Sequence, residues 1–166
     1  MPALTATFTS PLMGYTVRYP AGWTPTPATL IWLPDAPNYW DDPVGDRLES
    51  ATMGFRGTSQ KLAAGQSADA WLKAYLASSP SADCGTPEQI SAGGSEGTLD
   101  MNGCNGRGRL GGLVYDYAIV VGDHGYNFTM EGDVSHNLFL AMLATVTFDP
   151  EAAADNRHPS AASSTP

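Results

Sequence analysis

The chain has 166 residues, a length that suits one domain and is short for two. Seventeen acidic residues against eight basic ones give a formal net charge of -9, which speaks against a protein that binds nucleic acid or an anionic membrane surface. No apolar run is long enough to span a membrane, and the first twenty residues lack the regions of a signal peptide. We therefore expect no transmembrane segment, and either a cytosolic protein or a mature one that has lost its export signal.

Alternation of apolar and polar residues indicates strands in the first third of the chain. Over residues 13–19, Tyr15, Val17 and Tyr19 share one face, as in a half-buried strand. Pro20 ends this strand because its nitrogen has no proton to donate to a neighbouring strand. Three more segments are expected to be extended: residues 5–9, 28–33 and 51–57.

Two helices are expected, each with a capping residue and an apolar face. Ser67 suits the N-cap of the first helix, because its hydroxyl can accept a hydrogen bond from the first turn. Trp71 and Tyr75 follow at helical spacing, and Pro80 ends the helix. The second helix is expected to start at Asp133. Its buried face is expected to comprise Phe139, Met142, Leu143 and Val146.

The strongest strand signal is a hairpin of residues 113–121 and 125–131, joined by a Gly-Asp-His-Gly turn. Its alternating apolar residues define one face: Tyr115, Tyr117, Ile119, Val121, Tyr126, Phe128 and Met130. A short strand or tail is expected at 145–149. Hairpins with separate helices indicate an α+β fold with an antiparallel sheet. We expect one domain over residues 1–150 and a disordered tail over 151–166, which is rich in Ala, Ser and Pro.

Two well-known motifs occur without the structural context that their chemistry needs. Residues 93–97 match G-x-S-x-G, but no helix pattern follows Ser95 as a nucleophile elbow requires. Residues 106–111 match G-x-G-x-x-G, but a turn precedes them and a strand follows, so no helix N-terminus faces a dinucleotide. We expect Ser95 to lie in a hairpin loop. Arg107 and Arg109 are expected to be solvated charges, with attraction of a small anion as the alternative.

The stretch 34–50 is acidic and rich in proline, and it is expected to be an irregular loop. Its carboxylates are Asp35, Asp41, Asp42, Asp46 and Glu49. Calcium needs six or more oxygen ligands, but the spacing does not match an EF-hand, so we expect a solvated loop and no metal or cofactor. The histidines His124, His136 and His158 are scattered, and no nucleophile is placed beside them, so we expect surface residues.

Cys84 and Cys104 are the two cysteines of the chain, and they lie in a region rich in glycine and turns. An even number of cysteines suits one disulfide, which would stabilise the fold by roughly 3 kcal/mol on the chain-entropy model. The alternative is a pair of free thiols in a reducing compartment.

One string resembles a known family. Residues 14–23 read G-Y-T-V-R-Y-P-A-G-W, and a strand that ends in Y-P-x-G-W is similar to the opening of PsbP-like domains. That family includes an extrinsic photosystem II subunit, a nuclear Ran-binding protein and many bacterial secreted or lipoprotein domains. The resemblance implies an α/β/α sandwich with a central antiparallel sheet and two main helices, and it implies no shared active site. The cysteine pair and low lysine content resemble the bacterial exported members, which implies a location outside the cytoplasm or in the cell envelope.

We therefore expect a non-enzymatic, extracytoplasmic domain that binds a partner protein or a small apolar ligand. Its site would be an aromatic groove or patch formed by Trp23, Trp32, Tyr39 and Trp40. The alternatives are a small hydrolase that uses His124 or His136, and a structural domain of a larger envelope protein. Burial of all four aromatic side chains in the core would leave the binding hypothesis without its site.

Overall fold

A computed structural model describes residues 2–32, 41–78, 88–101, 110, 113–133 and 136–154. The elements in chain order are β1 Leu4–Thr9, β2 Tyr15–Pro20, β3 Thr24–Thr26, β4 Asp46–Glu49, β5 Met53–Lys61, α1 Ala68–Ser78, β6 Glu88–Ala92, β7 Ser95–Met101, β8 Leu113–Val121, β9 His124–Gly132, α2 His136–Leu143, β10 Thr147–Phe148 and the 3₁₀ helix η1 Pro150–Ala152. Among these described residues, no helix has the length and apolar character to cross a bilayer.

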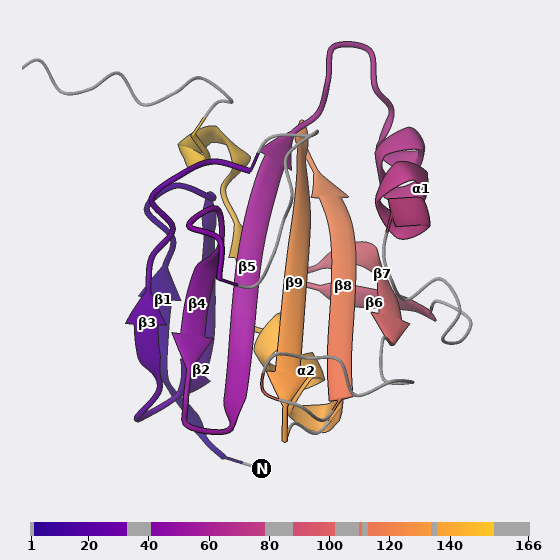
Figure 1. The fold of residues 1–166 in the computed structure, drawn as a ribbon. Coiled ribbons are helices and arrows are strands. Elements are labelled where there is room, and N and C mark those ends of the chain that lie inside the picture. Colours follow the sequence, from indigo (N-terminus) through magenta and orange to yellow (C-terminus); the bar gives the residue numbers. More distant parts are fainter. Residues whose placement is uncertain are drawn as a thin grey trace, which may run out of the picture.

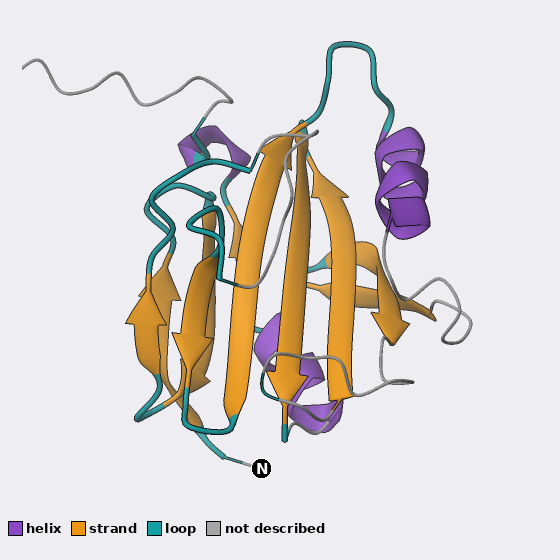
Figure 2. Ribbon diagram, viewed as in Figure 1, coloured by secondary structure: helices purple, strands orange, loops and turns teal. Residues whose placement is uncertain are grey.

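The fold is α+β and is built around a central antiparallel sheet. Seven strands follow the order β3-β4-β5-β9-β8-β7-β6, and β1, β2 and β10 form a second sheet of three strands. Figure 1 shows the long strands β5, β9 and β8 at the centre, with α1 on the near face of the large sheet and α2 on the far face. The expected arrangement of one helix on each face of a sheet is therefore present. In addition, α2 shares its layer with the three-stranded sheet, as the purple helix and orange strands behind the large sheet in Figure 2 show.

The main core lies between the two sheets and consists largely of aromatic side chains. Phe128 of β9 is fully buried, and its ring centroid lies 5.1 Å from that of Tyr15 and 5.6 Å from that of Phe55. Phe148 approaches from β10, and its ring meets Tyr126 edge-on at 4.8 Å. The alternation of residues 13–19 and 113–131 therefore predicted this face correctly, because burial on one face produces a period of two.

Both expected helices form, α1 with its predicted cap and α2 with its predicted buried residues, although Val146 lies beyond the end of α2 at Leu143. The Ser67 hydroxyl accepts a hydrogen bond from the Ala70 N–H at 3.2 Å and so caps α1. The four apolar residues expected on the buried face of the second helix, Phe139, Met142, Leu143 and Val146, are all buried. In the β8–β9 hairpin, Val121 pairs with His124, so the connecting turn contains only Gly122 and Asp123.

Several predictions for the short strands are wrong. Residues 28–32 form no strand, and the stretch 34–50, expected as a loop, contains β4. Strands of three and four residues, as in β3 and β4, are too short to show a period in the sequence. The strands β6 and β7 were also not predicted on either side of the expected hairpin loop; Gly93 and Gly94, both at positive φ, form the turn between them. Ser95 begins β7 rather than lying in the loop, and a strand follows it where a nucleophile elbow requires a helix.

Some sequence predictions concern residues outside the described ranges. These are the cysteines Cys84 and Cys104, the aromatic residues Tyr39 and Trp40, Asp35, Pro80, the arginines Arg107 and Arg109, His158 and the tail beyond residue 154.

Asp46 carries a carboxyl group inside the main core, and it leads to a prediction about pH. It is fully buried, and Oδ1 accepts a hydrogen bond from the Ala28 N–H at 2.7 Å. Burial raises the pKa of Asp46, against the lowering effect of its hydrogen bonds and of Arg56. An acid whose pKa is raised by folding contributes stability below its unfolded pKa, and that contribution is lost as the pH rises through the folded pKa.

Asp46→Asn keeps the acceptor for Ala28 and removes the charge. We expect the variant to be at least as stable as the native chain at pH 7 and to lose less stability between pH 4 and pH 7. Urea unfolding followed by tryptophan fluorescence at several pH values measures this. Asp41→Asn is the control, because the Asp41 carboxylate is largely exposed and pairs with Arg47 at the surface. A clear loss of stability at pH 7 in Asp46→Asn alone would contradict the argument.

Candidate functional site

The face of the large sheet that α1 covers, opposite the main core, is polar although it is buried. On β5, Arg56, Thr58 and Gln60 alternate with core residues and point to the face opposite Phe55. In the strand register, Thr129 lies opposite both Arg56 and Asp116. We call this surface the polar face, and its buried or half-buried members are Arg56, Thr58, Gln60, Asp116, Asn127, Thr129 and Glu131.

Asp116 holds the centre of the polar face together. Its Oδ1 atom accepts hydrogen bonds from Asn127 Nδ2 and, at 2.8 Å, from Thr129 Oγ1. Its Oδ2 atom accepts from the Tyr75 hydroxyl at 2.9 Å, which ties α1 to β8. Burial, followed by the charge of Asp116, raises the pKa of Tyr75, so the phenol stays protonated and can donate. Both carboxylate oxygens of Asp116 are therefore occupied by groups of the protein itself.

Three aromatic side chains cover the polar face, and we call them the aromatic roof: Trp32, Trp71 and Tyr75. Trp71 stacks on Tyr75 with ring centroids 5.4 Å apart, and Trp32 meets both rings edge-on. The indole Nε1 of Trp71 donates to Gln60 Oε1 at 2.7 Å. A β-carbon at Gly125 would overlap the Trp71 ring, so the absence of a side chain there allows the roof to lie directly on β9.

Arg56 is the charged residue of this site whose donors are least satisfied. Its side chain is buried, with the residue only 3% exposed, and neither Nε nor Nη2 has a hydrogen-bond partner. None of the ion pairs formed within the described residues involves Arg56. Burial lowers its pKa, and the charges of Asp42 and Asp116 act in the opposite direction without forming a direct pair. A β-carbon at Gly45 would overlap the guanidinium group, so a glycine is needed for Arg56 to occupy this position.

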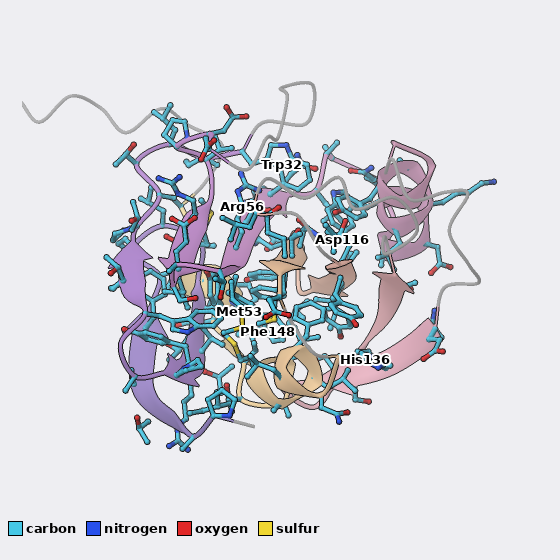
Figure 3. The ribbon with its side chains drawn as sticks, turned by 60° about the horizontal axis from the view of Figure 1, so that its bottom comes forward. Trp32, Met53, Arg56, Asp116, His136 and Phe148 are labelled. Carbon is cyan, nitrogen blue, oxygen red and sulfur yellow. The ribbon has the colours of Figure 1, made fainter. Side chains whose placement is uncertain are left out.

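Other donors beside Arg56 are also unsatisfied. The indole Nε1 of Trp32, the amide Nε2 of Gln60 and the hydroxyl of Thr58 are buried and have no partner. Figure 3 shows Trp32 and Arg56 close together on one side of the large sheet, with Asp116 on the same side and His136 and Phe148 on the other. Buried polar groups in native proteins are nearly always hydrogen-bonded, so each exception calls for an explanation. The groups of Arg56, Trp32, Gln60 and Thr58 can all donate, and the group that complements them is an acceptor. The Oε1 atom of Glu131, farther along the same face, is a buried acceptor that makes no hydrogen bond, although the residue has other interactions.

A second region lies at the tip of the β8–β9 hairpin. A cavity of about 710 Å³ is lined there by Lys61, Gly122, Asp123, His124, Pro150, Glu151 and Ala153. The Asp123 carboxylate contacts His124 Nδ1 at 2.8 Å and Lys61 Nζ at 3.4 Å. The hydrogen bond with His124, with Lys61 adding to it, lowers the pKa of Asp123. Of the described residues that line this cavity, none is a serine, threonine or cysteine that could act as a nucleophile.

The expectation that His124 is a surface residue is wrong, because the residue is only 2% exposed. The short turn makes His124 the first residue of β9 and places it opposite both Val121 and Lys61. His136 is half-buried at the start of α2, and its ring stacks on Tyr115 with centroids 5.4 Å apart. The two histidines therefore have different environments, and the structure does not bring them together.

The aromatic residues expected to form one patch are divided by the fold. Trp23 and Trp32 are each 8% exposed, but Trp23 belongs to the main core and Trp32 to the aromatic roof. Two members of the expected acidic loop are also in different settings, since Asp46 is in the core and Asp41 pairs with Arg47. Within the part of the chain that the structure describes, no three His, Cys, Asp or Glu side chains form a group that could hold a metal ion.

Comparisons with known proteins give the fold and no function. No family model matches the chain, and no curated protein matches it in sequence. One similar solved structure is a protein of Bacteroides thetaiotaomicron VPI-5482, with a TM-score of 0.56 and 13% sequence identity. The match covers 88% of this chain and 49% of that one, so the chain spans about half the length of this neighbour. At this level of identity the likeness concerns the fold alone.

Proposed function

We propose that the chain is a non-catalytic binding domain that takes a small-molecule ligand on the polar face, beneath the aromatic roof. The observation that carries the proposal is the buried guanidinium of Arg56, whose Nε and Nη2 atoms have no acceptor. The proposal keeps the role expected from the sequence. It changes the chemistry of the ligand from purely apolar to one that presents hydrogen-bond acceptors.

The unsatisfied donors of the polar face cost stability unless a ligand accepts hydrogen bonds from them. Leaving a buried donor without a partner costs about 1–3 kcal/mol, and more for a charged group. Well-packed apolar residues of similar volume would be neutral or stabilising at such positions. A protein that carries several unsatisfied donors on one face of a sheet gives up stability, and sites that bind ligands are the usual place where that occurs.

Entry of a ligand requires movement of the aromatic roof, because the unsatisfied atoms are shielded from solvent. The aromatic roof belongs to a small apolar cluster whose buried members are Trp32, Val44, Trp71 and Ala118. Two side-chain hydrogen bonds, Trp71 to Gln60 and Tyr75 to Asp116, connect α1 to the sheet. Among the described residues, this cluster has fewer buried members than the main core, and a layer with fewer buried contacts opens at a lower free-energy cost.

Native mass spectrometry of the protein purified from its own host, followed by hydrogen exchange, tests the proposal. We expect a small-molecule adduct that is released on unfolding in urea and rebinds after refolding. Rebinding should slow amide exchange in α1 and leave β1 and β2 unchanged. A bare chain whose α1 exchange does not respond to a small-molecule extract of the host would contradict the proposal.

The hydrolase alternative is supported by a specific observation, the contact of Asp123 with His124 beside the cavity at the hairpin tip. Such a contact orients an imidazole as a general base in many hydrolases. If this region is catalytic, His124→Gln abolishes hydrolysis of ester and amide substrates, and His136→Gln, which lies outside the cavity, leaves it unchanged. Equal activity in the native chain and His124→Gln would exclude this alternative.

We also propose that the domain lies outside the cytoplasm, because its sequence resembles exported PsbP-like domains. A disulfide between Cys84 and Cys104 is part of that proposal. The mass of the protein, isolated without reductant, is then two hydrogens below that of the reduced chain. A fully reduced mass would contradict the proposed location.

A further inference from the structure

We infer that the ligand carries a carboxylate group, which binds side-on to the edge of the Arg56 guanidinium formed by Nε and Nη2. This inference rests on the proposed function and names the class of ligand at that site.

The geometry of the guanidinium group is the first argument. Nε–H and Nη2–H lie on the same edge of the planar group and point in the same direction. That pair matches the two oxygens of a carboxylate in a bidentate contact, which is short and strong. In Arg56 both atoms of this edge are buried and have no hydrogen-bond partner. The site therefore lacks one bidentate acceptor rather than a single bridging atom.

The surrounding charges favour a carboxylate over a phosphate. Asp42 and Asp116 both act electrostatically on Arg56, and Glu131 is buried on the same face of β9. A group with one negative charge balances the guanidinium in this setting. A phosphate with nearly two negative charges would meet stronger repulsion from the same carboxylates.

The rest of the ligand is defined by the remaining contacts. Trp32, Trp71 and Tyr75 pack on one another, and movement of the aromatic roof would turn their ring surfaces to an apolar body, as ligand sites commonly do. Trp32 Nε1 and Gln60 Nε2 are further donors for an oxygen on that body. An aromatic or aliphatic carboxylic acid is the class of small molecule that satisfies both the guanidinium edge and the aromatic roof.

Nuclear magnetic resonance with benzoate and benzamide as probes tests the inference. The two probes have the same shape, and only benzoate carries a carboxylate. We expect benzoate, added to the native chain up to its solubility, to shift the Arg56 Nε–H and Trp32 Nε1–H signals, and benzamide to leave them unchanged. Arg56→Lys keeps the charge but lacks the two-pronged edge, and we expect it to bind benzoate at least tenfold more weakly, roughly 1.4 kcal/mol.

Arg47→Lys is the matched control, because Arg47 lies opposite Arg56 on the neighbouring strand and pairs with Asp41 at the surface. It should bind benzoate as the native chain does. Equal shifts from benzoate and benzamide, unchanged affinity in Arg56→Lys, larger shifts from inorganic phosphate, or no benzoate shift at all would each overturn the inference. The proposed function would survive any of these results if the host-derived ligand still slows exchange in α1, and it would fail only if that response were also missing.

Discussion

Replacing Asp116 with alanine is expected to lower the free energy of unfolding by about 3–5 kcal/mol. The carboxylate accepts hydrogen bonds from three donors on two neighbouring elements. Its removal takes the Asp116 acceptor from Tyr75 and leaves Asn127 and Thr129 with only their longer hydrogen bonds of 3.3 Å. The variant also removes a negative charge that acts on the buried guanidinium of Arg56. Because Tyr75 loses its bond to the sheet, amide exchange in α1 should increase more than exchange in β1 and β2.

Urea denaturation and hydrogen exchange measure these two effects. Tyr75→Phe is the matched partial variant, since it removes one of the three hydrogen bonds and should cost about 1 kcal/mol. Glu88→Ala, which removes an exposed carboxylate from the edge strand β6, is the control and should stay within about 0.5 kcal/mol of the native chain. A loss in Asp116→Ala no larger than in Glu88→Ala would show that the network does not hold the polar face together.

Phe128→Ala is expected to cost about 3–5 kcal/mol, the usual range for removing a buried aromatic ring. Phe128 is fully buried, and its ring contacts aromatic rings from four other positions: Tyr15, Phe55, Tyr126 and Phe148. These come from both sheets, so the cavity left by the substitution would separate the two sheets rather than weaken one strand.

Thermal and urea unfolding of Phe128→Ala measure this loss. Thr7→Ala, an exposed position on β1, serves as the control and should change little. A loss below about 1 kcal/mol in Phe128→Ala would mean that the space between the sheets does not form the main core.

The sequence predicts those strands in which apolar and polar residues alternate over many positions. The β8–β9 hairpin combines a long period-two pattern with a glycine turn, and both its strands and its apolar face were predicted. β3, β4, β6 and β7 were not, because their residues are few or largely polar, and because they are ordered by pairing with neighbouring strands. The three strands of the second sheet were each expected, but their residues did not indicate that they pair with one another in a separate sheet, since β10 contributes only two residues.

The candidate site could not be predicted for a related physical reason. Asp116, Asn127 and Thr129 alternate with aromatic core residues, and that pattern is typical of a face exposed to solvent. They are buried because α1 docks over them, with Trp71 lying on Gly125. A local pattern does not reveal which face of a sheet a distant helix will cover. The position of Trp32 in the aromatic roof, apart from Trp23, likewise depends on contacts between segments far apart in the chain.

The stability of Arg56→Met shows whether Arg56 serves a ligand or the fold. The substitution replaces the buried guanidinium with an apolar side chain and leaves the hydrogen bonds of Asp116 in place. We predict a free energy of unfolding, without ligand, that is unchanged or higher, by up to about 1–4 kcal/mol. A loss of about 3–5 kcal/mol would contradict the account, since it would mean that the cation is a structural partner of the buried carboxylates.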